Sequence, residues 1–313
     1  MIHQQLKRVS NVLIGLDTID GAGVKLKRIF GGMNSASITD PFLLLDQFGS
    51  TLREDYILGF PWHPHRGIET VTYLLDGKVT HMDSVGHSGT IHPDEVQWMT
   101  SGSGIFHQEM PDSLTAEDIK RLTYYNGEKN AVKGLQLWIN LPAIMKMETP
   151  SYRNITKKLI PVINDREGNT VKIIAGEYER ISNELPMKPH IDPMYIDVSM
   201  PPDSRFDFDV KPGHTSIINL ISGKIIGLVN YDKPLMERSA VVFSREGRKI
   251  HVETGNESGR FILITGKPLN EGIYWHGPIV MNTEEQIREA LSDLRNNRFV
   301  REKNQRLPEG FKR

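Results

Sequence analysis

Two pairs of side chains that can ligate a metal lie in the first half of the sequence. His63 and His65 are two residues apart in PWHPHRG, and His107 and Glu109 are two apart in GIFHQE. On an extended strand, residues two apart point to the same side. Two such pairs on facing strands would place three neutral imidazoles and one carboxylate around a point, which suits a first-row divalent ion. An octahedral metal with four protein ligands keeps open positions for water, oxygen or substrate.

The residues alone also leave alternatives to this metal site open. The chain has 11 histidines, so one His-x-His pair is unsurprising. Glu69 is a competing carboxylate, because it follows His65 at even spacing and could be a fourth or fifth ligand in place of Glu109. Seven further histidines are isolated, and we expect surface or hydrogen-bonded structural roles for them: His81, His87, His92, His190, His214, His251 and His276.

The composition limits what other chemistry is possible. The 313 residues are 38% hydrophobic and 25% charged, near the globular average, and the length suggests two domains. The absence of cysteine excludes disulfides, thiolate nucleophiles and Cys-based zinc or iron–sulfur sites. A formal net charge of −1 lacks the basic footprint of a dedicated nucleic-acid binder, so we expect no direct nucleic-acid partner.

The sequence also bears on location. No apolar run approaches the ~18–20 residues of a membrane span. The first residues lack the long apolar core and small-residue cleavage site of a secretion signal. We therefore expect no membrane association and a monomeric cytoplasmic protein, with the nucleus also possible in a eukaryote.

The metal-ligating pairs must be positioned mainly by β-strands. Strand-like runs alternate with Gly, Pro, Asn and Asp turns, for example at residues 70–75, 78–83, 135–140, 171–175 and 261–265. One helix is predicted near the C-terminus, where Asn282 or Thr283 can cap and Glu285 or Gln286 can reciprocate. Its apolar residues repeat at helical spacing: Ile287, Ala290, Leu291 and Leu294. This helix should pack against a sheet.

The two halves of the chain look related. Residues 73–79 match residues 219–225, a strand, a Gly turn and a strand in each case, and residues 141–150 are the best candidate linker between the halves. Shifts of 146 and 145 align the candidate ligands with Asp209, Lys211 and Thr215, and with Val252 and Thr254. Because these residues do not form a ligand set, we predict one metal per chain, in the N-terminal half.

A polar stretch from residue 112 to 133 interrupts the strand pattern just after Glu109. It contains a weaker helical signal at residues 115–122, followed by Tyr124 and Tyr125. The stretch could be a lid that narrows access to the metal, or a surface insertion that lies away from the site. The sequence favours neither.

Several motifs resemble the pirin family, within the cupin superfamily. They are DPFLLLDQFG (40–49), FPWHPHRGIETVTYLLDG (60–77), VQWMTSGSGIFHQEMP (96–111), GLQLWINLP (134–142) and GPIVMNTEEQI (277–287). The resemblance spans nearly the whole chain. It implies an all-β bicupin, two antiparallel β-barrel (jelly-roll) domains packed face to face with a C-terminal helix. The domains would be residues 1–143, with the metal, and residues 144–313, without it.

The resemblance also implies a ligand set and a function. The family's ligands carry over onto His63, His65, His107 and Glu109, and Glu69 becomes a close neighbour of the metal. The metal would be one divalent ion, first Fe(II), with Mn, Co, Ni, Cu or Zn as other choices. Pirins resemble quercetin 2,3-dioxygenases, in which a flavonol loses its 3-hydroxyl proton, here to Glu109 or a metal-bound hydroxide, and reacts with O2 to open its heterocycle. The alternative is a non-catalytic, iron-binding, redox-responsive regulator that docks on a transcription factor or metabolic enzyme.

Overall fold

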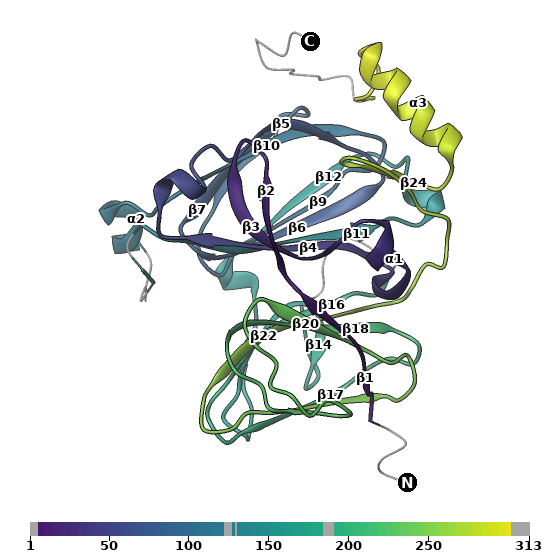
Figure 1. Ribbon diagram of the computed structural model, residues 1–313. Helices are drawn as coiled ribbons and strands as arrows, with labels where there is room; N and C mark the ends of the chain where they lie inside the picture. Colours follow the sequence, from purple (N-terminus) through teal and green to yellow (C-terminus); the bar gives the residue numbers. More distant parts are fainter. Residues whose placement is uncertain (1–5, 122–126, 129, 184–190, 302–313) are drawn as a thin grey trace. The chain divides into compact units, whose positions relative to one another are not determined.

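The computed structural model describes residues 6–121, 127–128, 130–183 and 191–301 (Figure 1). The chain forms two compact units, each built from separate segments. Unit 1 takes the described residues of Met1–Leu16, Ile29–Phe42 and Lys158–Asn270, and unit 2 takes those of Asp17–Arg28, Leu43–Lys157 and Glu271–Arg313. This interleaving differs from the predicted single division between residues 143 and 144. The described residues of Glu271–Arg313 group with those of Leu43–Lys157 in unit 2.

Unit 2 holds the candidate metal residues, and two antiparallel sheets dominate its described part. The larger sheet has the order β12 (Ser151–Ile155), β9 (Val96–Thr100), β6 (Ile68–Asp76), β11 (Val132–Asn140), β4 (Phe42–Ser50), β3 (Val24–Gly31) and β2 (Leu16–Asp20). The smaller has the order β5 (Phe60–His65), β10 (Ile105–Asp112), β7 (Lys78–Asp83) and β8 (Ser88–Ile91). A hairpin follows from β23 (Tyr274–His276) and β24 (Ile279–Met281).

Unit 1 repeats this plan. Its larger sheet has the order β1 (Val9–Ile14), β20 (Ser239–Phe243), β18 (Thr215–Gly223), β22 (Gly259–Gly266), β16 (Met194–Met200), β14 (Thr170–Tyr178) and β13 (Val162–Asn164), with β15 (Ile181–Asn183) paired to β14. Its smaller sheet has the order β17 (Arg205–Asp209), β21 (Lys249–Glu253) and β19 (Gly227–Leu228). Apolar side chains from both sheets form its core, among them Phe206, Ile218, Val252 and Leu263.

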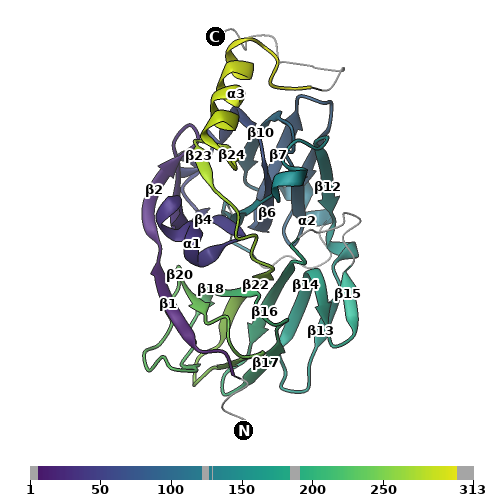
Figure 2. The same cartoon turned by 90° about the vertical axis from the view of Figure 1, so that its right-hand side faces the viewer.

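The all-β prediction and each of the five predicted strands are confirmed. Helices are short in the described residues: α1 (Met33–Thr39), α2 (Ala116–Arg121), α3 (Glu284–Arg295) and the 3-10 turns η2 (Arg53–Asp55), η3 (Ala143–Met145) and η4 (Lys157–Leu159). α3 is the predicted C-terminal helix, and Figure 2 shows it beside β23 and β24. Thr283 caps it, and Gln286 completes the capping box.

The proposed linker at residues 141–150 lies within unit 2. Its Lys146 is fully buried, and Nζ donates to the carbonyl oxygens of Gly67 and Val280 and to Asn140 Oδ1, at 2.7–2.9 Å. A flexible linker would not bury a charged side chain in this way, because such burial requires fixed partners. The chain instead passes from unit 2 to unit 1 after Lys157.

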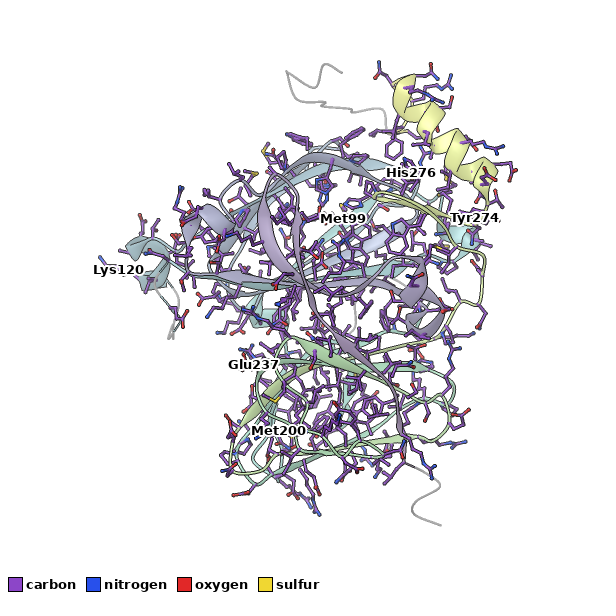
Figure 3. All side chains as sticks on the ribbon, viewed as in Figure 1. Met99, Lys120, Met200, Glu237, Tyr274 and His276 are labelled. Carbon is purple, nitrogen blue, oxygen red and sulfur yellow. The ribbon has the colours of Figure 1, made fainter. Side chains whose placement is uncertain are left out.

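The polar stretch after Glu109 is described only in part. The predicted helix is present as α2, and Lys78 Nζ lies 2.8 Å from Asp118 Oδ2, which ties α2 to the start of β7. Figure 3 shows Lys120 on α2, and Met99 on β9 of the larger sheet. Tyr124 and Tyr125, which a lid would use, lie outside the described residues, so the lid stays a prediction.

Candidate metal centre

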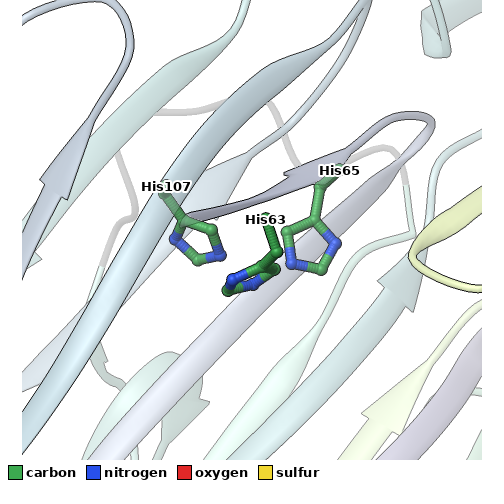
Figure 4. A group of neighbouring side chains, drawn as sticks. All are labelled: His63, His65 and His107. Atoms are coloured by element: carbon green, nitrogen blue, oxygen red, sulfur yellow. The ribbon is translucent and has the colours of Figure 1, made fainter. Parts of the chain in front are cut away.

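Three histidines converge between the two sheets of unit 2. The possible ligand atoms of His63, His65 and His107 all lie within 4.8 Å of one another, and Figure 4 shows the three rings grouped together. Their ring centroids are 4.3–4.9 Å apart. Nitrogen atoms at such separations can share one ion, given metal–nitrogen bonds of about 2.0–2.1 Å for an ion such as zinc.

Strand pairing produces this convergence. β5 and β10 are antiparallel neighbours, with His107 directly opposite His63 and Ile105 opposite His65. Side chains on directly opposed residues of such a pair lie on one face. The register shifts between His107 and Glu109, where β5 carries one extra residue, so Glu109 pairs with Phe60.

The ring nitrogens are arranged for ligation. His63 Nδ1 lies 2.8 Å from the Pro61 carbonyl oxygen, and His65 Nδ1 lies 3.2 Å from that of Pro278. Each imidazole that donates from Nδ1 leaves the Nε2 lone pair free for a metal. His107 is buried, and neither of its ring nitrogens has a hydrogen-bond partner in the described chain. A buried polar atom without a partner is costly, and a bound metal would satisfy it. The residues present therefore fit a metal ion.

Burial also sets the charge of these rings. Desolvation lowers the pKa of His63, and it holds the pKa values of His65 and His107 well below their usual range. The rings are thus neutral at pH 7, the form that binds metals. His63 is the least buried of the three.

Glu109 lies beside this group without being part of it. It is 5% exposed, and its Oε1 accepts a 2.8 Å hydrogen bond from the Thr72 hydroxyl on β6. Desolvation raises the pKa of Glu109 to about 7, with the Thr72 hydrogen bond opposing the shift. Such a carboxyl can exchange a proton near neutral pH. The structure thus brings together three of the four predicted ligands, and Glu109 stays a predicted ligand.

Glu69 is not the close neighbour of the metal that the resemblance implies. It pairs with Ile139, whereas the adjacent Thr70 pairs with Trp138, whose ring is 5.1 Å from that of His65. Glu69 therefore faces the other side of the larger sheet, where it accepts a 2.8 Å hydrogen bond from Thr100. The reason is a break in the strand, because β5 ends at His65 and β6 begins at Ile68. Even spacing across that break no longer means a shared face.

Sequence reasoning missed several residues at this site. Thr72 and Trp138 face the histidines, and strand alternation could have found them once the pairing of β6 with β11 was known. His81, for which a surface or hydrogen-bonded structural role is predicted, is buried on β7 directly opposite Glu109, and that role stays a prediction. Its ring lies 4.7 Å from that of Tyr152.

Unit 1 lacks an equivalent donor set in its described residues. Val252, the counterpart of His107, pairs with Phe206, and Ile250 pairs with Phe208. The counterparts of His63 and His65 are therefore Phe206 and Phe208 rather than Asp209 and Lys211. The shift of 146 fails here because five residues separate β17 from β18, whereas two separate β5 from β6. Stacked aromatic rings fill the space that the histidines occupy in unit 2.

Comparisons with known proteins agree with this geometry. Residues 23–139 match the family model Pirin, and residues 195–300 match the model for the pirin C-terminal cupin domain. Human pirin is 35% identical over 302 residues, which cover 95% of this chain and 96% of that protein. The chain belongs to the pirin family. The predicted family and its two-cupin fold are thereby confirmed.

Two other proteins similar to this chain carry enzyme names. A protein of Thermoplasma acidophilum named "Putative quercetin 2,3-dioxygenase" is 44% identical over 270 residues, covering 82% of this chain and 98% of that one. The crystal structure of a quercetin 2,3-dioxygenase from Acinetobacter baumannii superposes with a TM-score of 0.81 at 31% identity, covering 94% of this chain and 98% of that one. Among the described residues of this pirin, no helix is long and apolar enough to cross a membrane.

Proposed function

We propose that this pirin is a metal-dependent dioxygenase that opens the heterocycle of quercetin-type flavonols with O2. The observation that carries the proposal is the group of three buried, neutral histidines, with both nitrogens of His107 unpartnered, beside a carboxyl whose pKa is near 7. The names of the relatives at 31–44% identity support the reaction class. Iron(II) is the proposed metal.

His63, His65 and His107 would hold the ion, with Glu109 as the fourth ligand and proton acceptor. A bound divalent metal would supply a Lewis acid and a template that orients the substrate and O2. Glu109 would take the proton of the flavonol 3-hydroxyl, because burial raises the pKa of its carboxyl and so favours the protonated form. Thr72 would fix the orientation of that carboxylate by donating a hydrogen bond to Oε1. Trp138 would hold the His65 ring by edge-to-face packing.

Metal analysis and oxygen uptake test this proposal. We expect the purified protein, reconstituted with Fe(II), to bind about one ion per chain and to consume O2 with quercetin, releasing carbon monoxide. His107→Ala should lose most of the metal and the activity, since no nearby imidazole replaces it. His251→Ala, on β21 of unit 1, is the matched control and should keep both.

Two results would contradict the proposal in different ways. Full metal content in the His63→Ala/His107→Ala double variant would overturn the assigned ligands. A metal-replete wild type that takes up no O2 with quercetin or related flavonols would instead favour the alternative, a non-catalytic iron-binding regulator with a protein partner.

A further inference from the structure

The C-terminal segment of unit 2 covers the outer face of the two strands that carry the histidines. Residues that alternate with the histidines point outward, namely Trp62 on β5 and Phe106 on β10. Both pack in one apolar cluster with residues of α3 and of the chain after it, including Ile287, Ala290 and Phe299. The rings of Phe106 and Phe299 are 5.6 Å apart. Figure 1 shows α3 in yellow near the label of β24.

Arg66, the residue after His65, is enclosed by this segment. Its side chain is 1% exposed, and its Nη1 donates to Asp293 Oδ2 at 3.0 Å. Its Nη2 donates to the Phe299 carbonyl oxygen at 3.0 Å, and the guanidinium carbon lies 4.3 Å from the centroid of the Phe299 ring. Every partner described for this buried cation therefore comes from α3 or from the residues just after it.

The same segment contacts His65 itself. The Pro278 carbonyl oxygen lies 3.2 Å from His65 Nδ1, and the Val280 backbone N–H donates to the Arg66 carbonyl oxygen at 3.1 Å. The orientation of the His65 ring is thus tied to the hairpin that leads into α3. Asp293 is buried on the face of α3 that also buries Ile287 and Ala290. A charged residue on that face must have a partner. The partner of Asp293 at hydrogen-bond distance is Arg66, at 3.0 Å, and the more exposed Arg298 and Arg301 lie 3.5 and 3.8 Å from its carboxylate.

We propose that Arg66 and Asp293 are positioning residues for the metal ligand His65, with α3 acting as a clamp on the histidine strands. This inference rests on the proposed metal site. A buried ion pair is weak evidence for stability as such, since apolar residues of similar volume often serve as well. A fixed guanidinium next to a ligand restricts the backbone that carries the ligand. Loss of a group hydrogen-bonded directly to a metal ligand typically costs 10–100-fold in metal affinity, and Asp293 lies one contact further from His65, so we expect the lower end of that range.

The first test changes Asp293 and measures how tightly the protein binds a metal ion. Asp293→Asn keeps the shape of the side chain and removes its charge, so we expect Co(II) affinity, measured by competition with a chelator, to fall about tenfold. The visible d–d spectrum of the bound Co(II) should also change, because His65 is no longer held in one orientation. Glu284→Gln is the matched control, since Glu284 forms an exposed pair with Arg288 on the same helix. The control should leave both readouts unchanged.

The second test needs no variant. Coupling between two sites is reciprocal, so a clamp that favours metal binding must itself be stabilised by the metal. We expect Co(II) to slow hydrogen–deuterium exchange in residues 284–295 of the wild type. If the Arg66–Asp293 ion pair were purely structural, the amides of residues 284–295 would exchange at the same rate with and without metal.

The outcomes separate this inference from the proposed function. A wild type that binds no metal overturns the metal site and this inference with it. A wild type that binds Co(II), with equal affinity and spectrum in Asp293→Asn and no metal effect on α3, overturns the positioning role alone.

Discussion

At the residue scale, spacing identified the histidines because a strand has a fixed side-chain period of two. His63 and His65 share one unbroken strand, and His107 lies directly opposite His63 on its neighbour. The same rule misplaced Glu69, because the positive φ of Gly67 marks a break between β5 and β6 that the residue types do not reveal. Glu109 was predicted by residue type and resemblance, whereas its partner Thr72 depends on pairing between strands distant in sequence.

Glu69 gives a prediction at this scale. Desolvation raises the pKa of its carboxyl to about 7, so between its unfolded value near 4.5 and pH 7 the folded state binds more protons than the unfolded state. Stability from this group is therefore lost as pH rises through that window. We expect Glu69→Gln to be no more stable than its parent near pH 5. At pH 8 it should be more stable by up to about 3 kcal/mol, because one pKa unit corresponds to about 1.36 kcal/mol. Urea unfolding of metal-free protein at both pH values measures the difference, and parallel pH profiles would contradict it.

At the element scale, local patterns predicted the strands and the cap of α3, since periodicity and capping are properties of neighbouring residues. They did not predict the junction of β5 and β6. There Gly67 has a φ of 79°, and an added Cβ would lie 2.1 Å from the Val280 carbonyl oxygen. Val280 is more than two hundred residues away, so no local pattern could reveal this close approach.

Gly67→Ala therefore tests the junction. The new methyl group must displace backbone, so we expect a loss of at least about 3 kcal/mol in unfolding free energy. Gly86→Ala is the matched control, because Gly86 also has a positive φ, 100°, but has nothing within 4 Å of an added Cβ. It should lose only the conformational cost of about 1–2 kcal/mol. Equal losses in the two variants, measured by urea unfolding, would show that the contact with Val280 is unimportant.

At the scale of the whole molecule, the internal repeat predicted two related halves, but no sequence pattern predicted their interleaving. The chain passes between units after Leu16, Arg28, Phe42, Lys157 and Asn270. The first three of these junctions lie inside β2, β3 and β4, which are neighbours in one sheet. Such sharing depends on which strands pair, and hydrophobic periodicity carries no information about partners.

Shared strands should make the two units unfold together, because loss of unit 1 would fray the sheet that contains β2, β3 and β4. The four tryptophans, Trp62, Trp98, Trp138 and Trp275, all belong to unit 2, so their fluorescence reports that unit alone. Far-UV circular dichroism reports both units. We expect the two thermal transitions to coincide, and Co(II) at a hundred times its Kd to shift both equally, adding about 3 kcal/mol of stability. His107→Ala should show no such shift, whereas a fluorescence transition displaced from the dichroism transition would mean that each unit unfolds independently.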